Sequence, residues 1–496
     1  MKNRRNWRCI VGASVATSML LTGCTARGTP STSDLYKGMQ GTVDWQTEGQ
    51  NFRDGYNQFS VELLQRAAAP GQNTLLSPLS VGMNLSMVAA GAKGQTREEL
   101  LSLLGLEEGS PLLELGFGAW MAEVGQLPHG RLDVANSLWY REGEPFTLNQ
   151  EYADRMIRQF GAQIEGADFS DPALPGKINR WVSDRTGGMI DKMVDEIPEI
   201  AVLYLLNALY FEEDWKTPYL AHQVGEDWFW REDGTGVQAE FLYDSGSFLY
   251  VENERAQGFV RPFADDRFVF LALLPTSTGP LQDYVEGLTA EELTQLWEGR
   301  KEGNVVTRIP TFSYGYEVEL KEPLEALGVH SAFEMEEADL SGMGYSTDGA
   351  LYLSKVKHKT FITLDAQGVR AGAATMSEVN SGGAMPELQI ELDRPFVYAI
   401  WDTQLEVPIL LGTVADPTGG KAGGEWLEGE IVQKPQDGQL VLKLAEPIEG
   451  VEQLVAQREE SYFWPGEVQK GSRVRILYQG DPADGKVTLL GCQLLE

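Results

Sequence analysis

The chain has 496 residues, of which 42% are hydrophobic, 10% aromatic and 23% charged. This composition is typical of a globular protein and excludes a wholly disordered, collagen-like or coiled-coil chain. The 73 acidic and 40 basic residues give a net charge of -33, so a duplex phosphate backbone would repel the chain, and we expect no nucleic-acid partner.

The first 24 residues are typical of an export signal. A basic start precedes an apolar run from Cys9 to Leu21, which is too short to span a bilayer comfortably. The run ends in Leu21-Thr22-Gly23-Cys24, which resembles the bacterial lipobox. We therefore expect cleavage of residues 1–23, lipidation of Cys24 and attachment to the outer face of the bacterial membrane. The alternative is an ordinary secretory signal in which Cys24 is incidental.

Residues 24–51 are polar and rich in Gly, Ser and Thr, which predicts a flexible tether. A folded domain is expected over residues 52–418. Within it, Ser77-Pro78 is typical of a helix cap followed by proline in the first turn. The segment Thr96-Arg97-Glu98-Glu99 fits a capping box, which predicts a second helix that starts at Thr96 and stops at Gly105.

Later segments of this domain are predicted strands buried on both faces. They are residues 201–211, 268–274 and 396–400, the last of these paired with 407–414. Because helices fill the first third and strands dominate the rest, the pattern indicates an α+β fold with large antiparallel sheets.

A Gly-rich linker, residues 419–425, separates this domain from residues 426–496. Asp437-Gly438 stands between two alternating segments, which is a strong hairpin signal. Five or six short strands in so few residues predict a small all-β barrel of the oligonucleotide/oligosaccharide-binding (OB) type.

The sequence shows no pattern of an enzyme or a metal site. Its four histidines, His129, His222, His330 and His358, lie far apart, and no HExxH pair is present. Gly480 to Lys486 approaches a phosphate loop, but Val487 stands where Ser or Thr would bind magnesium. A GxSxG nucleophile elbow is also absent. A Ser-His-Asp triad need not be contiguous, but no residue indicates one. We expect no enzyme, no metal and no cofactor.

Several separate segments resemble the serpin family, in the right order and over about residues 52–417. They are TLLSPLSVGMNLSMVAAGAKGQTREEL from Thr74, LDVANSLWY from Leu132, INRWVSDRTGGMID from Ile178, LNALYFEEDW from Leu206, AF with ADLSGM from Ala332 and Ala338, VKHKTFITLDAQG from Val356 and DRPFVYAI from Asp393. The resemblance implies a fold of about nine helices and three β-sheets, with an exposed reactive loop that can insert into a sheet.

The reactive loop is expected from about Gly368 to Glu391. By period two, one strand face would hold Val369, Ala371, Ala373 and Thr375, and the other Arg370, Gly372, Ala374 and Met376. The first face is small and uncharged, as entry into a packed sheet requires. The family's usual spacing puts the scissile bond at Gly382-Gly383, and Ser381, Ala384 and Met385 remain alternatives for the residue before the cut.

The resemblance implies a suicide-substrate inhibitor. A serine or cysteine protease would attack the scissile bond, and the freed loop would insert into the main sheet before the acyl-enzyme is hydrolysed. Small or apolar residues at the cut indicate an elastase-like or subtilisin-like target rather than a trypsin-like one, and a papain-like protease remains open. We expect a monomer. The competing interpretation is a non-inhibitory binding protein with the same fold.

Other family positions match a polar cluster that holds the sheet closed: Ser77, Ser80, Asn207 and His358, with Trp215 near the hinge. Two hinge residues depart from the family pattern, because Val369 replaces Thr or Ser and Ala366 replaces Glu. Glu212-Glu213-Asp214 replaces the usual Lys-Gly pair, and we expect no clear consequence from this change.

Overall fold

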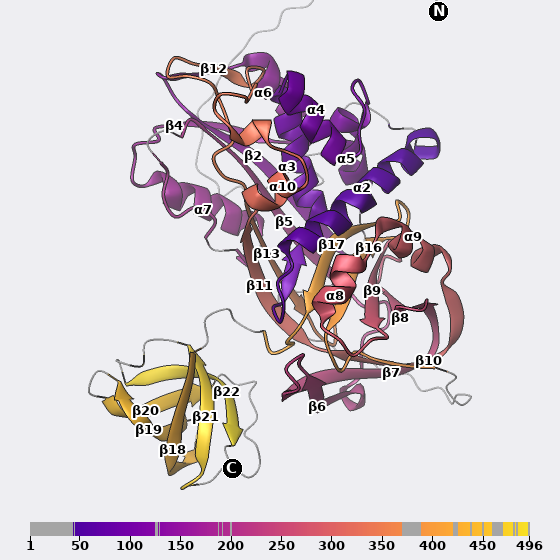
Figure 1. Cartoon of the computed structure of the whole chain (residues 1–496), viewed down its shortest axis with the longest axis vertical. Helices are drawn as coiled ribbons and strands as arrows, with labels where there is room; N and C mark the ends of the chain where they lie inside the picture. Colours follow the sequence, from indigo (N-terminus) through magenta and orange to yellow (C-terminus); the bar gives the residue numbers. More distant parts are fainter. Residues whose placement is uncertain are drawn as a thin grey trace, which may run out of the picture.

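The computed structural model describes residues 43, 45–124, 127, 129–186, 188–190, 192–198, 201–369, 388–419, 425–436, 439–448, 451–458, 470–479, 482 and 485–494. Figure 1 shows helices and sheets in the larger part of the chain and a small barrel formed by its last strands. The expected signal with Cys24, and the loop residues 370–387, lie outside the described residues.

Nine α-helices lie in the described residues. They are α2 (Trp45–Ala67), α3 (Pro78–Gly91), α4 (Gly94–Leu103), α5 (Leu112–Val124), α6 (Gln150–Phe160), α7 (Leu174–Arg185), α8 (Leu281–Gly287), α9 (Ala290–Glu298) and α10 (Lys321–Ala326). Two short 3₁₀ turns are η1 (Ala221–Gln223) and η2 (Ser331–Phe333). The number of helices agrees with the expectation for the serpin fold.

The first helix in the described residues, α2, begins earlier than the sequence predicts. Residues 45–51 were expected to belong to a flexible tether, but α2 already includes them. Trp45 packs edge-on against Phe52 with a ring distance of 5.4 Å, and its indole N–H donates to Glu123 at 2.9 Å. These contacts with the folded part stabilise a helical turn that its polar composition does not reveal.

The predicted cap of α3 is confirmed, whereas the capping box of α4 is wrong. Ser77 Oγ accepts the backbone N–H of Ser80 at the start of α3. By contrast, α4 begins at Gly94, and Thr96 lies inside the helix. The Thr96 hydroxyl accepts from the N–H of Asp339 at 3.0 Å, and Glu99 accepts from the N–H groups of residues 330 and 331. Both side chains therefore bind a distant segment instead of their own helix end.

A nine-stranded sheet forms one half of the larger part. Its order is β1 (Thr74–Leu76), β17 (Val407–Val414), β16 (Phe396–Asp402), β9 (Phe268–Pro275), β8 (Ala256–Pro262), β7 (Gly236–Glu252), β10 (Lys301–Pro310) and β15 (Leu388–Glu391), with β6 (Val224–Trp230) paired to β7. The predicted strands 268–274, 396–400 and 407–414 are confirmed here. Their residues are buried on both faces, as their continuous apolar pattern predicts.

A second, six-stranded sheet contains the site described below. Its order is β11 (Phe312–Glu319), β13 (Lys357–Leu364), β14 (Gly368–Val369), β5 (Leu203–Asp214), β2 (Arg131–Arg141) and β4 (Gln163–Ala167). A small sheet pairs β12 (Gly344–Ser346) with β3 (Phe146–Leu148). The described residues before the barrel thus form three sheets.

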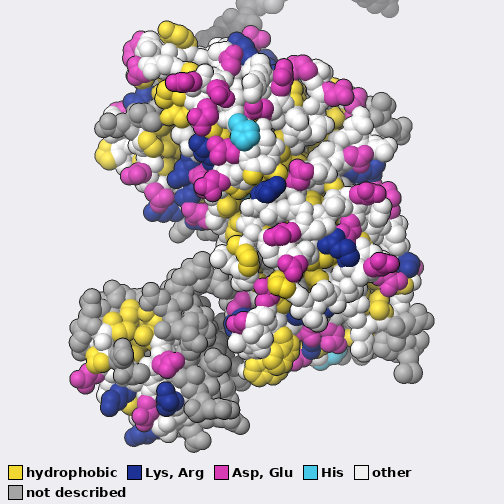
Figure 2. Space-filling model, viewed as in Figure 1, with side chains coloured by type: hydrophobic (Ala, Val, Ile, Leu, Met, Phe, Trp, Pro, Cys, Tyr) yellow, Lys and Arg dark blue, Asp and Glu magenta, His cyan; other side chains and the backbone are white. Residues whose placement is uncertain are grey.

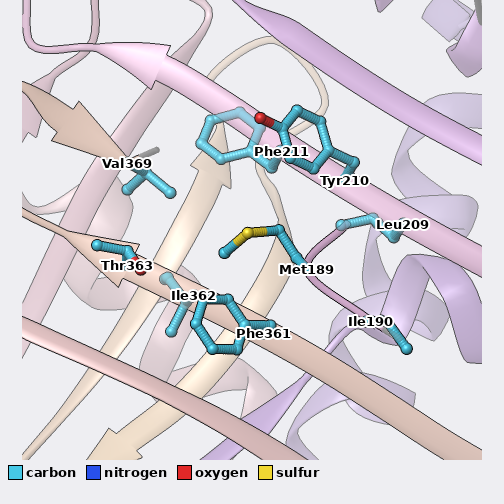
Figure 3. A pocket seen from close by; sticks show the side chains of 9 residues that line it. All are labelled: Met189, Ile190, Leu209, Tyr210, Phe211, Phe361, Ile362, Thr363 and Val369. Carbon is cyan, nitrogen blue, oxygen red and sulfur yellow. The ribbon is translucent and has the colours of Figure 1, made fainter. Parts of the chain in front are cut away.

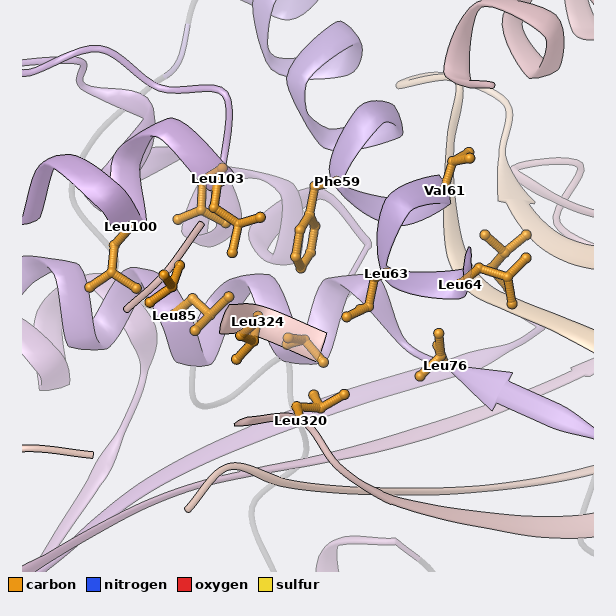
Figure 4. Close-up of a cluster of buried hydrophobic side chains, with 14 of the residues drawn as sticks. Phe59, Val61, Leu63, Leu64, Leu76, Leu85, Leu100, Leu103, Leu320 and Leu324 are labelled. Carbon is orange, nitrogen blue, oxygen red and sulfur yellow. The ribbon is translucent and has the colours of Figure 1, made fainter. Parts of the chain in front are cut away.

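Helices α2, α3 and α4 pack on these sheets through a large apolar cluster. Figure 4 shows part of it, where side chains from α2, α3, α4 and α10 meet above the strands. Phe59, Leu63, Leu85, Leu100 and Leu324 are each 1% exposed or less. Burial of one such side chain contributes about 1.5–3 kcal/mol, so this cluster fixes α3 against the six-stranded sheet.

The C-terminal strands close into a separate barrel. Its order is β18 (Glu425–Gln436), β19 (Gln439–Ile448), β20 (Val451–Arg458), β22 (Lys486–Leu494) and β21 (Arg473–Gln479). The strands β18 and β19 pair up to Gln436 and Gln439, so the hairpin predicted around residues 437–438 is confirmed. An apolar core of its own, including Ile431, Leu442 and Ile476, fills the barrel. The predicted small OB-like barrel is therefore confirmed as an architecture.

Candidate functional site

The candidate site is a gap in the six-stranded sheet between β5 and β13. Among the described residues, only the two of β14 pair between these strands: Gly368 pairs with Asp214, and Val369 pairs with both Glu213 and Leu364. Beyond this short bridge, no ladder joins β5 directly to β13 in the described part of the chain. The strand β14 is antiparallel to both neighbours, so β5 and β13 run parallel to each other and share one open groove.

Figure 3 shows the side chains that line the gap. Leu209, Tyr210 and Phe211 come from β5, Phe361, Ile362 and Thr363 come from β13, and Val369 closes one end. The free space among them is small, about 20 Å³, and is partly open to solvent. Met189, from the segment after α7, projects between the two strands. The groove is therefore mainly apolar, and one flexible side chain partly fills it.

A tight turn leads the chain into the head of the gap. The carboxylate of Asp365 accepts the N–H groups of Gln367 at 2.7 Å and Gly368 at 3.2 Å, and the N–H of Asp365 donates back to the carbonyl of Gly368 at 2.9 Å. A Cβ atom at position 368 would lie 2.1 Å from the carbonyl oxygen of Glu213. Only glycine permits this close approach, so Gly368 fixes where the loop meets β5.

Trp215 anchors this turn from the other side. Its indole N–H donates to the carbonyl of Asp365 at 2.9 Å, and its backbone N–H donates to Gln367 at 2.7 Å. The ring stacks on Phe263 with a centroid distance of 4.7 Å and is 1% exposed. The guanidinium of Arg261 lies 5.3 Å from the Trp215 ring and 3.9 Å from that of Tyr219. This packing of aromatic rings and a guanidinium group fixes Trp215, and through Trp215 it fixes the turn before Gly368.

Hydrogen bonds from the start of α3 connect β13, on one side of the gap, to β5, on the other side. The backbone N–H of Ser77 donates to Nε2 of His358 on β13 at 3.1 Å. On the other side of the gap, the Ser80 hydroxyl donates to Oδ1 of Asn207 on β5. The Asn207 amide in turn donates to Asn136 of β2 at 2.6 Å. The N-terminus of α3 therefore links β5 to β13 where the strands do not pair with each other.

The charge state of His358 follows from its burial. The side chain is 6% exposed, and burial lowers its pKa to about 4. Because Nε2 accepts a hydrogen bond, the neutral ring carries its proton on Nδ1. At neutral pH the link between α3 and β13 thus holds no charge, and acid would convert its acceptor into a donor.

A strap formed by residues 188–190 and 192–198 lies between α7 and β5 along the chain. Asn179 of α7 binds it through the N–H groups of Met193 and Val194, both at 2.8 Å. On β13, Lys359 donates to the carbonyl of residue 192 at 2.8 Å, and Lys357 lies 3.3 Å from Asp195. Figure 2 shows Lys and Arg side chains gathered near α7. Through these bonds the strap holds Met189 over the gap.

Comparison with known proteins identifies this arrangement. The family model described as "Serpin (serine protease inhibitor)" matches residues 54–417. The chain belongs to the serpin family. The crystal structure of a thermophilic serpin, tengpin, in the native state is 33% identical, with a TM-score of 0.69, and the match covers 76% of this chain and 96% of that one.

Two further relatives show the breadth of the similarity. An uncharacterised serpin-like protein of Thermococcus kodakarensis is 28% identical over 405 residues, which are 79% of this chain and 93% of that protein. A thyroxine-binding globulin, in complex with thyroxine, is 20% identical with a TM-score of 0.65, over 74% of this chain and 99% of that one. The second likeness is one of fold alone.

Seven of the site residues named from the sequence lie in the part of the chain that the structure describes, and all seven lie around the gap. Ser77, Ser80, Asn207 and His358 form one hydrogen-bonded group, Trp215 lies at the head of the gap, and Gly368 and Val369 form β14. The other expected hinge residues, Arg370 to Thr375, and the candidate cut-site residues, Ser381 to Met385, lie outside the described residues, as does Cys24.

Sequence reasoning missed three contributors: Asp365, Met189 and Glu213. Asp365 is detectable in principle, because an Asp shortly before a Gly often forms such a turn. Met189 comes from a distant segment, and no local pattern shows that it reaches the gap. Glu213 was noticed as a departure from the family, but its burial at 1% exposure needed the structure.

Within the described ranges, no helix is both long and apolar enough to cross a membrane. Those ranges also hold no group of three or more His, Cys, Asp or Glu side chains arranged to bind a metal ion.

Proposed function

We propose that this serpin is an irreversible suicide-substrate inhibitor of serine proteases, and of cysteine proteases where their specificity fits. The observation that carries the proposal is the gap between β5 and β13, whose head already holds the first two residues of the loop as β14. A sheet with an open, strand-wide gap beside the attached end of a loop can accept that loop as a new strand.

The register of β14 indicates where an inserted loop would lie. Continued from Val369, it places residue 371 between Phe211 and Ile362, and residue 373 between Leu209 and Thr360. Residue 375 would then lie between Asn207 and His358. Ala371 and Ala373 are small enough for packed neighbours, and the Thr375 hydroxyl can bond the polar pair. The side chains on the expected inward face of the loop therefore suit their neighbours on β5 and β13, which are apolar near residues 371 and 373 and polar near residue 375.

Backbone hydrogen bonds from the inserted loop to both β5 and β13 would supply the free energy that drives insertion. The facing edges of β5 and β13 offer backbone N–H and C=O groups that a new strand can bind. Each backbone hydrogen bond contributes about 0.5–1.5 kcal/mol net. Several such bonds to β5 and several to β13 would therefore stabilise the inserted state strongly. Met189 must leave the gap for the strand to pass, which gives the insertion a barrier.

The chemistry is that of the target protease. Its serine hydroxyl or cysteine thiol would attack the carbonyl carbon of the scissile bond, forming an acyl-enzyme and releasing the amine of the following residue. Water would normally hydrolyse the acyl-enzyme. Insertion that is faster than this step would carry the attached protease along and distort it, so the bond persists. This chain would supply no catalytic group of its own.

The target should cut after a small or apolar residue. We propose the bond Gly382-Gly383, with Ser381, Ala384 and Met385 as alternatives for the residue before the cut. These residues fit the specificity pocket of an elastase-like or subtilisin-like protease.

The proposal is tested by mixing the protein with pancreatic elastase or subtilisin and running the mixture on a denaturing gel. A band at the summed mass that survives SDS is expected, with peptide sequencing placing the new N-terminus near Gly383. Trypsin, which needs a basic residue, is the control and should give no such band at this bond. Cleavage without a covalent band at every protease ratio would contradict the proposal.

A non-inhibitory binding protein is the second candidate. It is favoured by the fold shared with the thyroxine complex and by the hinge residues Val369 and Ala366, which depart from the family pattern. Val369 nevertheless packs in the sheet at 2% exposure, so a valine at this position does not prevent entry of the hinge. Failure of every protease to form the covalent band would favour this candidate.

We further propose that the protein is exported and anchored by a lipid on Cys24 to the outer face of a bacterial membrane. The support is the sequence Leu21-Thr22-Gly23-Cys24 and the basic, apolar segment before it. Metabolic labelling with palmitate should mark the wild-type protein and spare Cys24→Ala. Equal labelling of both would contradict the anchor.

A further inference from the structure

A buried carboxyl group lies beside the hinge and has no role in the mechanism above. Glu213 on β5 is the Cα partner of Val369 on β14, and both side chains are buried, at 1% and 2% exposure. One oxygen, Oε1, accepts the backbone N–H of Asp265 at 2.8 Å. The other, Oε2, is buried without a hydrogen-bond partner. An unpaired buried oxygen is costly, so its charge state matters to its neighbours.

The surroundings of Glu213 oppose a negative charge. Burial is the main cause that raises its pKa to about 8, and the negative charges of Asp265 and Asp266 raise it further. Lys216, the cation that follows β5, pairs with Asp266 at 2.7 Å. Gly130 covers the group from the other side, because a Cβ atom there would lie 2.7 Å from Cγ of Glu213.

The remaining groups around Glu213 are fixed in other bonds. The Asp265 carboxylate accepts the backbone N–H groups of His129 and Gly130, at 3.0 and 2.9 Å. Asp365 is bound to the amides of the hinge turn, and Glu212 points to the opposite face of β5, where it accepts from the Tyr210 hydroxyl at 2.7 Å. In the described structure, a proton on Oε2 is therefore the direct way to neutralise Glu213.

We propose that Glu213 is a positioning residue for the loop hinge: as a neutral acid it packs beside Val369, and its ionisation favours release of the hinge from the gap. The inference deepens the proposed inhibitory function, because Val369 must stay in the sheet for the loop to follow it. Release of β14 removes the strand beside Glu213 and admits water to its carboxyl group, which lowers the cost of the charge.

The sign of the effect follows from proton linkage. With the hinge packed, Glu213 keeps its proton up to about pH 8, whereas a solvated carboxyl group would lose it near its ordinary value of 4.5. Between these two values the packed state binds more protons than the released state. The preference for the packed hinge therefore falls as pH rises through this window, by at most about tenfold per pH unit. It is constant above the window.

Hydrogen exchange measured by mass spectrometry on the full chain tests this directly. Protection of the amides of Gly368 and Val369 is followed from pH 5 to 8, after correction for the intrinsic pH dependence of exchange. We expect protection to fall about two- to tenfold per pH unit in the wild type. In Glu213→Gln, which keeps the shape of the neutral acid, the slope should vanish and protection should stay at the wild-type value of pH 5.

Two further variants keep the test decisive. Glu212→Gln changes the neighbouring carboxylate on the opposite face and should keep the wild-type slope. Glu213→Ala should lose the slope even if its protection is lower at every pH. An equal slope in the wild type and Glu213→Gln would overturn the inference, whether or not any protease is inhibited.

The same variants give a functional readout with subtilisin as the probe. The amount of serpin consumed per protease inactivated should rise with pH more steeply in the wild type than in Glu213→Gln. Comparison at each pH cancels the pH dependence of subtilisin itself. If neither protein forms a covalent band while the exchange slopes differ as expected, the proposed function fails and the role of Glu213 in the hinge stands.

Discussion

The two large sheets of this serpin differ in how completely their strands pair. In the nine-stranded sheet, β9 pairs with β8 over seven positions and with β16 over six, so both of its edges are satisfied. In the six-stranded sheet, β14 joins β5 by two positions and β13 by one. The interior of the first sheet is therefore fully paired at β9, whereas the interior of the second can still gain hydrogen bonds by accepting a strand.

This difference separates the roles of stability and function. Strands β9, β16 and β17 are buried on both faces and make the rigid half of the molecule. The open sheet is held by side chains instead of a ladder, through the α3 link at Ser77 and Ser80 and through the strap at Lys357 and Lys359. Substitutions in the first sheet should change stability, and those around the gap should change how the loop inserts.

The largest expected effect comes from the nine-stranded sheet. Leu271→Ala removes a side chain that is fully buried on β9 and should lower the free energy of unfolding by about 2–5 kcal/mol. The fraction of protease trapped, measured at a temperature where the variant is folded, should stay that of the wild type. Urea unfolding and a stoichiometry titration measure the two quantities. A changed stoichiometry would show that the two sheets are not independent.

A smaller and pH-dependent effect is expected at the link between α3 and β13. The pKa of His358 is about 4 in the folded protein, below the ordinary value of 6.5, so the unfolded state binds more protons between these values. Stability should therefore fall as pH drops from about 6.5 to 4, by up to about 3 kcal/mol. His358→Gln keeps an acceptor and should lose this dependence. Unfolding curves of both proteins at pH 7, 5.5 and 4 give the comparison. An equal loss of stability in the wild type and in His358→Gln would show that His358 does not cause it.

The sequence predicts the nine-stranded sheet better than the open one. Continuous apolar runs identify β9, β16 and β17, because residues buried on both faces leave a local signature. The Ser77 cap is also local and was predicted, as were the residues that match family positions. Thr96 fits a capping box equally well, but tertiary contacts with Asp339 and residue 331 take its hydroxyl instead. Met189 and Glu213 owe their roles to segments far along the chain, which no local pattern encodes.

Met189→Ala tests whether the side chain in the gap limits the rate at which a strand enters the six-stranded sheet. The side chain is only half-buried, so we expect a loss of about 1 kcal/mol in stability. Because the obstacle between β5 and β13 becomes smaller, a synthetic peptide with the sequence of residues 369–380 should be incorporated faster. Met335→Ala, at a side chain that is 52% exposed, is the matched control and should leave the rate unchanged. An unchanged rate in Met189→Ala would mean that the strap does not limit insertion.

The smallest effect is expected from removing the barrel. It has its own apolar core and follows a Gly-rich linker, so we propose that it folds independently of the serpin domain. A chain that ends at Thr418 should unfold at the same temperature as the serpin domain of the full protein and inhibit at the same rate. Loss of folding in the shortened chain would place the domain boundary elsewhere.

The central claim is that the loop inserts between β5 and β13 with residues 369, 371, 373 and 375 facing inward. The most direct measurement is the amount of serpin consumed per subtilisin inactivated, for Ala373→Arg and Ala374→Arg side by side. Ala373→Arg would bury an unpaired charge between Leu209 and Thr360, which costs several kcal/mol and slows insertion, so this variant should be cleaved without a covalent complex. Ala374→Arg should project to the other face and remain close to wild type. An equal rise in both variants, or in neither, would contradict insertion in this register.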